Sequence, residues 1–131
     1  MPSKREEFRV KGLADPISHY TDAVRFGDLV FISGLAPFDA AGKLVAPSDP
    51  VGQTEQIFRN MRLVLDAVGA DFADILRVTV YLTDIADRAR INPVRQKYFG
   101  KARPASTLVE VSALVVPEMK VEIEAVIGLA K

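Results

Sequence analysis

The sequence predicts an α+β domain with one mixed β-sheet that two helices cover on a single face. Two observations support this fold class. Three short apolar segments typical of strands come first, two segments with helical spacing alternate with a fourth strand, and two further strands end the chain. This order suits a sheet packed against one layer of helices. At 131 residues, without an internal repeat or a linker, the chain is expected to form a single domain over residues 1–131.

The first three strands are predicted over residues 8–10, 20–26 and 29–33. Gly27-Asp28, between the last two, has the composition of a two-residue hairpin turn, because glycine adopts a positive φ without strain. The run at residues 29–32 is continuously apolar, so we expect the third strand to be buried on both faces.

The first helix is predicted to begin at Asp49-Pro50, since a carboxylate caps a helix N-terminus and proline fits the first helical position. Gly69 is expected to end it, because glycine readily adopts the left-handed conformation that follows a helix. Gln53 is placed on the outward, polar side. The inward, apolar side consists of Ile57, Met61, Val64, Leu65 and Val68.

A fourth strand is predicted over residues 75–82, with Leu76 on the same face as Val78. A second helical segment follows and contains Asn92-Pro93. Because an interior proline breaks a helix, we expect a short helical turn and then a separate helix over residues 93–99 that Asn92 caps.

The chain ends with two predicted strands over residues 105–112 and 121–126, joined by a short turn as a hairpin. Glu122 and Glu124 share one face of the last strand, which must therefore face water or a polar cleft. The strands carry more apolar surface than two helices can cover, so a homo-oligomer is expected. The residues that supply this surface are Val24, Phe31, Val109 and Val111.

Composition argues against several classes of function. The 17 lysines and arginines balance 17 aspartates and glutamates, so we expect neither nucleic acid nor a membrane surface as a partner. No apolar stretch is long enough to span a bilayer, and we expect no secretory signal in the charged N-terminus. The absence of cysteine excludes disulfides and thiolate nucleophiles and agrees with a cytoplasmic location. A single histidine, acidic residues without calcium-loop spacing and scattered glycines predict no metal site and no cofactor.

Five segments, in the same order along roughly a hundred residues, resemble motifs of the RidA/YjgF family of reactive-intermediate deaminases. They are Ile-Ser-His-Tyr-Thr-Asp-Ala-Val at 17–24, Leu-Val-Phe-Ile-Ser-Gly at 29–34, Val-Tyr-Leu-Thr-Asp-Ile-Ala-Asp at 80–87 with Asn92, Arg-Pro-Ala-Ser at 103–106, and Val-Glu-Ile-Glu-Ala-Val at 121–126. The resemblance implies a chorismate-mutase-like fold and a homotrimer whose clefts between subunits bind a small molecule.

The deaminases of this family hydrolyse enamines or imines to 2-oxo acids and ammonia. The resemblance implies that Glu122 is the catalytic residue, which orients the attacking water and needs a pKa raised by burial. It also implies that the backbone at Ser33-Gly34 polarises the substrate. The implied substrate-binding residues are Tyr20, Ser33, Gly34, Asn92 and Ser106.

Ser106 departs from the family pattern, which has an arginine there that grips the substrate carboxylate. A serine hydroxyl lacks the charge, so affinity for a carboxylate should fall by about 1.5–3 kcal/mol. Arg103 is expected on the opposite face of the strand, and Arg88 is another cation that could reach the cleft. The aligned cleft residues then carry no formal positive charge, which favours neutral or cationic ligands over dicarboxylates.

Two functions stay open at this point. One is an enzyme that deaminates a small enamine, imine or related unsaturated metabolite, with a substrate unlike that of arginine-bearing relatives. The other is a non-catalytic trimer of the same family that binds a small molecule or regulates a partner enzyme. Turnover separates the two. The sequence does not identify the substrate, because substrate choice depends on loop residues such as 35–45.

Overall fold

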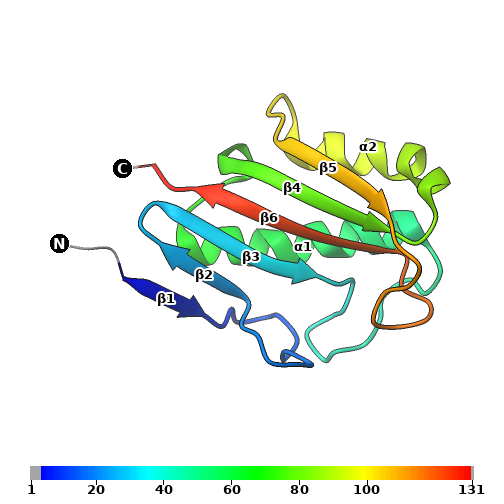
Figure 1. Cartoon of the computed structure of the whole chain (residues 1–131), viewed down its shortest axis with the longest axis horizontal. Coiled ribbons are helices and arrows are strands. Elements are labelled where there is room, and N and C mark those ends of the chain that lie inside the picture. The colour runs from blue at the N-terminus through cyan, green and yellow to red at the C-terminus, as the bar shows by residue number, and fades with distance from the viewer. Residues whose placement is uncertain (1–3, 131) are drawn as a thin grey trace.

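Six strands form one mixed sheet, and both helices lie on the same side of it (Figure 1). The structure is a computed structural model that describes residues 4–130. The strands are β1 (Arg5–Phe8), β2 (Ala23–Phe26), β3 (Leu29–Leu35), β4 (Ile75–Leu82), β5 (Ala105–Glu110) and β6 (Val121–Gly128). The helices are α1 (Pro50–Val68) and α2 (Arg88–Phe99), each next to a short 3₁₀ turn, Phe72–Asp74 or Ile85–Asp87. The predicted α+β architecture and the predicted order of its elements are confirmed.

The predicted C-terminal hairpin is wrong, because β5 and β6 do not pair. The strand order is β1-β2-β3-β6-β4-β5, with β6 antiparallel to both β3 and β4, and β5 parallel to β4 at the edge. Residues 111–120 cross the end of β4, where Thr83 N donates to Lys120 O at 3.2 Å. Burial explains the arrangement: alternate residues of β6 are fully buried, whereas β5 is largely exposed and suits an edge.

Each strand has one face toward the helices and one open face. Val30 and Ile32 are buried against the helices, but Leu29 is 40% and Phe31 47% exposed on the open face, so the prediction of a strand buried on both faces is wrong. Leu76 is 51% exposed, contrary to prediction, because the pairing of β4 with β6 shifts between residues 75 and 77. This irregularity turns Ile75 toward the core instead of Leu76.

Helix α1 begins and ends where the sequence predicts. The Asp49 carboxylate accepts a hydrogen bond from Val51 N at 3.1 Å, and Gly69 adopts a left-handed φ of 73°. Along the inward side, Val68 is only half-buried. The other predicted core positions are fully buried: Ile57, Met61, Val64 and Leu65.

Helix α2 is continuous through Pro93, so the predicted break is wrong. Pro93 is exposed, and without an N–H it cannot donate the helical hydrogen bond to the carbonyl of Ala89. Ile91 and Val94, on either side of it, are buried in the core and hold both halves of the helix in place. Asn92 is therefore an interior helical residue and not a cap.

The first two strands are displaced from their predicted positions by a loop. β1 covers Arg5–Phe8 and β2 starts at Ala23, because the carboxylate of buried Asp22 accepts a hydrogen bond from Val10 N at 2.7 Å. Asp22 N donates in turn to Phe8 O at 3.1 Å, which closes residues 9–22 into a loop. Tyr20 thus lies in this loop and not in a strand.

Gln53 is fully buried, contrary to its predicted outward position. Its Nε2 donates to Ala46 O at 3.1 Å and to Glu118 O at 2.8 Å, and its Oε1 accepts from Lys120 N at 2.6 Å. A single side chain therefore ties the first turn of α1 to the loop before it and to the segment that leads into β6.

We predict that Gln53→Ala lowers the free energy of unfolding by about 2–4 kcal/mol, because it leaves buried backbone groups without partners. Urea denaturation followed by circular dichroism measures the loss. Arg59→Ala, on the exposed side of the same helix, is the control and should change stability by less than about 0.5 kcal/mol. Equal stability of the two variants would contradict this role for Gln53.

Candidate functional site

A hollow of about 370 Å³ lies where the loop at residues 13–22 meets the end of β3 and the open face of β6. We call it the Glu122 hollow. It brings together four of the predicted site residues, from the loop, β3 and β6. Its lining consists of Ile17, Ser18, Tyr20, Ser33, Gly34, Ala36, Phe38, Val115 and Glu122.

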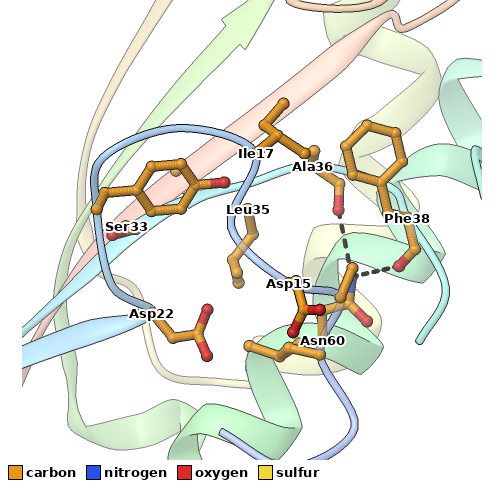
Figure 2. A pocket seen from close by; sticks show the side chains of 12 residues that line it. Asp15, Ile17, Asp22, Ser33, Leu35, Ala36, Phe38 and Asn60 are labelled. Carbon is orange, nitrogen blue, oxygen red and sulfur yellow. Dashed lines mark hydrogen bonds between the residues drawn. The ribbon is translucent and has the colours of Figure 1, made fainter. Parts of the chain in front are cut away.

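The wall of this hollow is held by Asn60 of α1, which the sequence analysis did not single out. Its Nδ2 donates to Ala36 O at 3.2 Å and to Phe38 O at 3.0 Å. Figure 2 shows these two bonds in the wall of an adjoining small pocket, which Asp22 and Leu35 also line. The amide fixes the backbone that follows β3, so the hollow has a rigid side.

Glu122 is half-buried, and no hydrogen-bond donor within residues 4–130 contacts its carboxylate. Burial raises the pKa of Glu122, and the charge of Glu124 two residues along β6 raises it further. The Tyr81 hydroxyl donates to Glu124 Oε1 at 2.9 Å, and this bond raises the pKa of Tyr81. Glu124 thus has a partner that holds it next to Glu122.

Gly34 allows the Glu122 carboxylate to pack directly on the β3 backbone, since a Cβ at this position would collide with that carboxylate. Ser33 N donates to Asp22 O at 3.0 Å, and Ser33 Oγ donates to Thr21 O at 2.5 Å. The Ser33 N–H is therefore not available to a substrate, and the predicted oxyanion role stays open only for Gly34. Tyr20 lies at the mouth with 47% of its surface exposed.

Asn92 and Ser106 lie elsewhere, in a hollow of about 750 Å³ between α2 and β5 that we call the arginine hollow. Ser106 pairs with Val78, whose side chain faces the helices, whereas Glu122 pairs with Tyr81 on the open face. Within one chain, the predicted site residues therefore fall into two groups on opposite faces of the sheet. The lining of the arginine hollow is Arg88, Asn92, Arg95, Gln96, Phe99, Gly100, Ala102, Arg103, Pro104, Ser106 and Leu108.

Arg88, Arg95 and Arg103 line this hollow, and none of its lining residues is acidic. The prediction of no formal positive charge concerned only the aligned residues, and the hollow that contains Asn92 and Ser106 adds three cations to them. One of the three is Arg88, which was expected to be able to reach the cleft. Arg103 precedes β5 and shares the hollow with Ser106, so its predicted position on the opposite face is wrong.

Arg95 is the functional candidate that the sequence analysis missed. Its Nη2 donates to Ser106 Oγ at 3.0 Å, and burial lowers the pKa of its guanidinium. Arg88, Asn92 and Arg95 have the spacing of one helix face. The sequence contains this i, i+4, i+7 spacing. The expected helix break at Pro93 would have placed Arg88 and Arg95 on separate helical segments, so the shared face was not recognised.

Two general properties of residues 4–130 bear on the chemistry. No helix there is long and apolar enough to cross a membrane. In the same range, no three histidine or acidic side chains lie close enough together to hold a metal ion.

A protein-family model described as Endoribonuclease L-PSP matches residues 12–128. The chain belongs to the RidA/YjgF family. A RutC family protein of Pyrococcus horikoshii is 39% identical over 111 residues, which cover 85% of this chain and 87% of that protein. A goat 2-iminobutanoate/2-iminopropanoate deaminase is 35% identical over 111 residues, covering 84% of this chain and 80% of that enzyme.

The fold of the family is also shown. The crystal structure of RidA from an Antarctic Psychrobacter species superimposes with a TM-score of 0.88 at 30% identity, covering 95% of this chain and 99% of that one. The predicted family membership and chorismate-mutase-like fold are thereby confirmed.

We predict that Glu124→Gln lowers the pKa of Glu122 and leaves it above its ordinary value, because the charge of Glu124 is removed while burial remains. The side-chain carbonyl of the introduced glutamine can still accept the Tyr81 hydrogen bond, so the local packing should persist. Carbon-13 NMR titration of the carboxylates measures the shift. Glu6→Gln, on the exposed strand β1, should leave the Glu122 titration unchanged. A Glu122 pKa that does not fall in Glu124→Gln would show that the two carboxylates are not coupled.

Proposed function

We propose that this protein hydrolyses a small imine or enamine to a carbonyl compound and ammonia, with Glu122 as the general base. The single observation that carries the proposal is the half-buried carboxylate of Glu122, which has a raised pKa and no hydrogen-bond donor within residues 4–130. A carboxylate with a raised pKa is a stronger base than an ordinary glutamate, which suits it to accept a proton from water. The imino-acid deaminase among the relatives supports the reaction class.

The chemistry requires only water and one proton carrier. Ionised Glu122 takes a proton from water as the oxygen attacks the carbon of the protonated imine, which gives an intermediate with a hydroxyl and an amino group on one carbon. Protonated Glu122 then returns this proton to the nitrogen. The C–N bond breaks and ammonia leaves, while the hydroxyl gives its proton to Glu122 and becomes the carbonyl of the product. Glu122 passes that proton to the departing ammonia, which leaves as ammonium. One water is consumed for each ammonia released.

The neighbours of Glu122 have matching supporting roles. Gly34 lets the substrate and the carboxylate approach the β3 backbone, and Tyr20 offers a hydroxyl at the mouth. Glu124, held by Tyr81, keeps the proton affinity of Glu122 high. Activity should therefore rise with pH as Glu122 ionises, with a midpoint above the ordinary pKa of a glutamate side chain.

We also propose a homotrimer in which the Glu122 hollow of one subunit meets the arginine hollow of its neighbour. The predicted site residues lie on opposite faces of the sheet in one chain, so they can form one site only across a subunit boundary. The open face also carries exposed Phe26, Leu29 and Phe31, an apolar surface of the kind that subunit interfaces cover.

Light scattering should give three times the chain mass of 14.3 kDa for the wild type. Phe31→Glu places a charge on the open face and should shift the protein toward monomers, because an unpaired charge is costly to bury in an interface. Val51→Glu, an exposed position on α1, is the matched control and should keep the trimer. A monomeric wild type would refute the proposed site between subunits.

Glu122→Gln should lower the rate of ammonia release from imines by about 10²-fold or more, because glutamine cannot accept the proton. Imines generated in place by an amino-acid oxidase, with ammonia measured against time, provide the assay. Glu118→Gln, exposed in the loop before β6, should keep wild-type activity. If wild type releases no ammonia above background from any imine or enamine, the enzyme proposal fails and the non-catalytic binding trimer replaces it.

A further inference from the structure

The arginine hollow contains an excess of positive charge that nothing within residues 4–130 neutralises. Arg88, Arg95 and Arg103 all line it, and none of them forms an ion pair in that part of the chain. Four arginines elsewhere in residues 4–130 do form ion pairs, among them Arg62 with Asp71 at 2.8 Å and Arg90 with Asp87 at 3.1 Å. Three unpaired guanidinium groups around one hollow favour an anionic ligand.

Arg95 is the best placed of the three to make the first contact. It is half-buried, and the only hydrogen bond of its guanidinium within residues 4–130 is the one to Ser106 Oγ at 3.0 Å. A guanidinium has five N–H donors in a planar fork, so most of them remain free for a ligand. The neutral Ser106 hydroxyl orients the group without neutralising it.

Ser106 and Arg95 together account for the departure from the family pattern. An arginine at position 106 would place a second guanidinium beside that of Arg95 and would repel it. A serine there accepts a hydrogen bond from Arg95 instead. The cation that the family motif carries on the strand is thus present in this chain on helix α2.

We propose that Arg95 binds the carboxylate of the substrate, that Ser106 positions Arg95, and that Arg88 and Arg103 bind a second anionic group. The preferred ligand is then a small dianion, and the substrate class is an imine or enamine of a dicarboxylic acid. One carboxylate satisfies one guanidinium fork, which leaves two cations in the same hollow for the other anionic group. The imine part of this statement rests on the proposed function. The anion site does not.

Binding of stable 2-oxo compounds tests the anion site without turnover. Calorimetry compares 2-oxoglutarate, 2-oxobutyrate and 2-oxobutyramide, which carry two, one and no negative charges. We expect 2-oxoglutarate to bind about 10-fold or more tightly than 2-oxobutyrate, the amide to bind weakest, and both acids to weaken as salt concentration rises. Equal affinity for amide and acids would overturn the proposal.

Three variants separate the roles of the arginines. Arg95→Gln should weaken both acids by about 10- to 100-fold, whereas Arg88→Gln and Arg103→Gln should weaken only 2-oxoglutarate. Arg77→Gln is the matched control. Its Nη2 also donates to a β5 hydroxyl, Thr107 Oγ1 at 2.6 Å, but Arg77 is not part of the hollow, so its removal should leave binding unchanged.

A double variant tests whether acid binding depends on which element carries the guanidinium. In Arg95→Gln/Ser106→Arg the guanidinium returns to the strand, and affinity for 2-oxobutyrate should recover to within about 10-fold of wild type. Thermal unfolding checks that each variant is folded, and Arg95→Lys, which keeps the charge without the fork, should bind both acids with intermediate affinity.

Two outcomes with the variants would also overturn the anion site. Unchanged binding in folded Arg95→Gln is one. Arginine variants that change the oligomeric mass but not the affinity for acids are the other, because the guanidiniums would then pair with carboxylates of a neighbouring subunit. Acid binding without ammonia release would instead refute the deaminase and leave the anion site standing.

Discussion

The alternation of side chains along β6 is the constraint on which the rest of this structure depends. Val121, Ile123 and Ile127 are fully buried against the helices, and Glu122 and Glu124 project from the other face. A slip of one residue would exchange the two sets and bury carboxylates in the core. Because β6 lies between β3 and β4, it is paired on both sides, so the packing of the core also fixes the position of the Glu122 carboxylate.

Local signals in the sequence were sufficient for some elements. Asp49, Pro50 and Gly69 act within one turn of α1, and the helix begins and ends there. The 75–82 strand was predicted with its observed bounds. The pairing of β5 and β6 is different, because the choice between a hairpin and insertion beside β4 depends on segments far away in the chain. The helix break at Pro93 was wrongly predicted for a similar reason. Proline does destabilise the helix locally, but the burial of Ile91 and Val94 in the tertiary structure stabilises it more.

The candidate site was predicted in part. Tyr20, Ser33, Gly34 and Glu122 lie together, as the motifs suggested, because the motifs mark the ends of adjacent strands. Of the three cations in the arginine hollow, only Arg88 was considered from the sequence to be within reach of the cleft. The charge of the site was judged from aligned positions alone, whereas Arg95 belongs to a helix face that is apparent only when α2 is continuous. A motif on one strand carries no information about a cation that lies on another element.

The two amide side chains of α1 have a consequence for how this protein can diversify. Gln53 and Asn60 hold the loop after β3 through the main-chain carbonyls of Ala36, Phe38 and Ala46, and not through its side chains. Every amino acid offers the same carbonyl, so exchanging the side chains of Ala36 or Phe38 leaves these anchoring hydrogen bonds in place. The tip of the loop is different, because the Asp39 carboxylate accepts hydrogen bonds from Ala41 N and Lys43 N. Ala36 and Phe38 also line the Glu122 hollow, so its lining can vary at these two positions without loss of the bonds that anchor it.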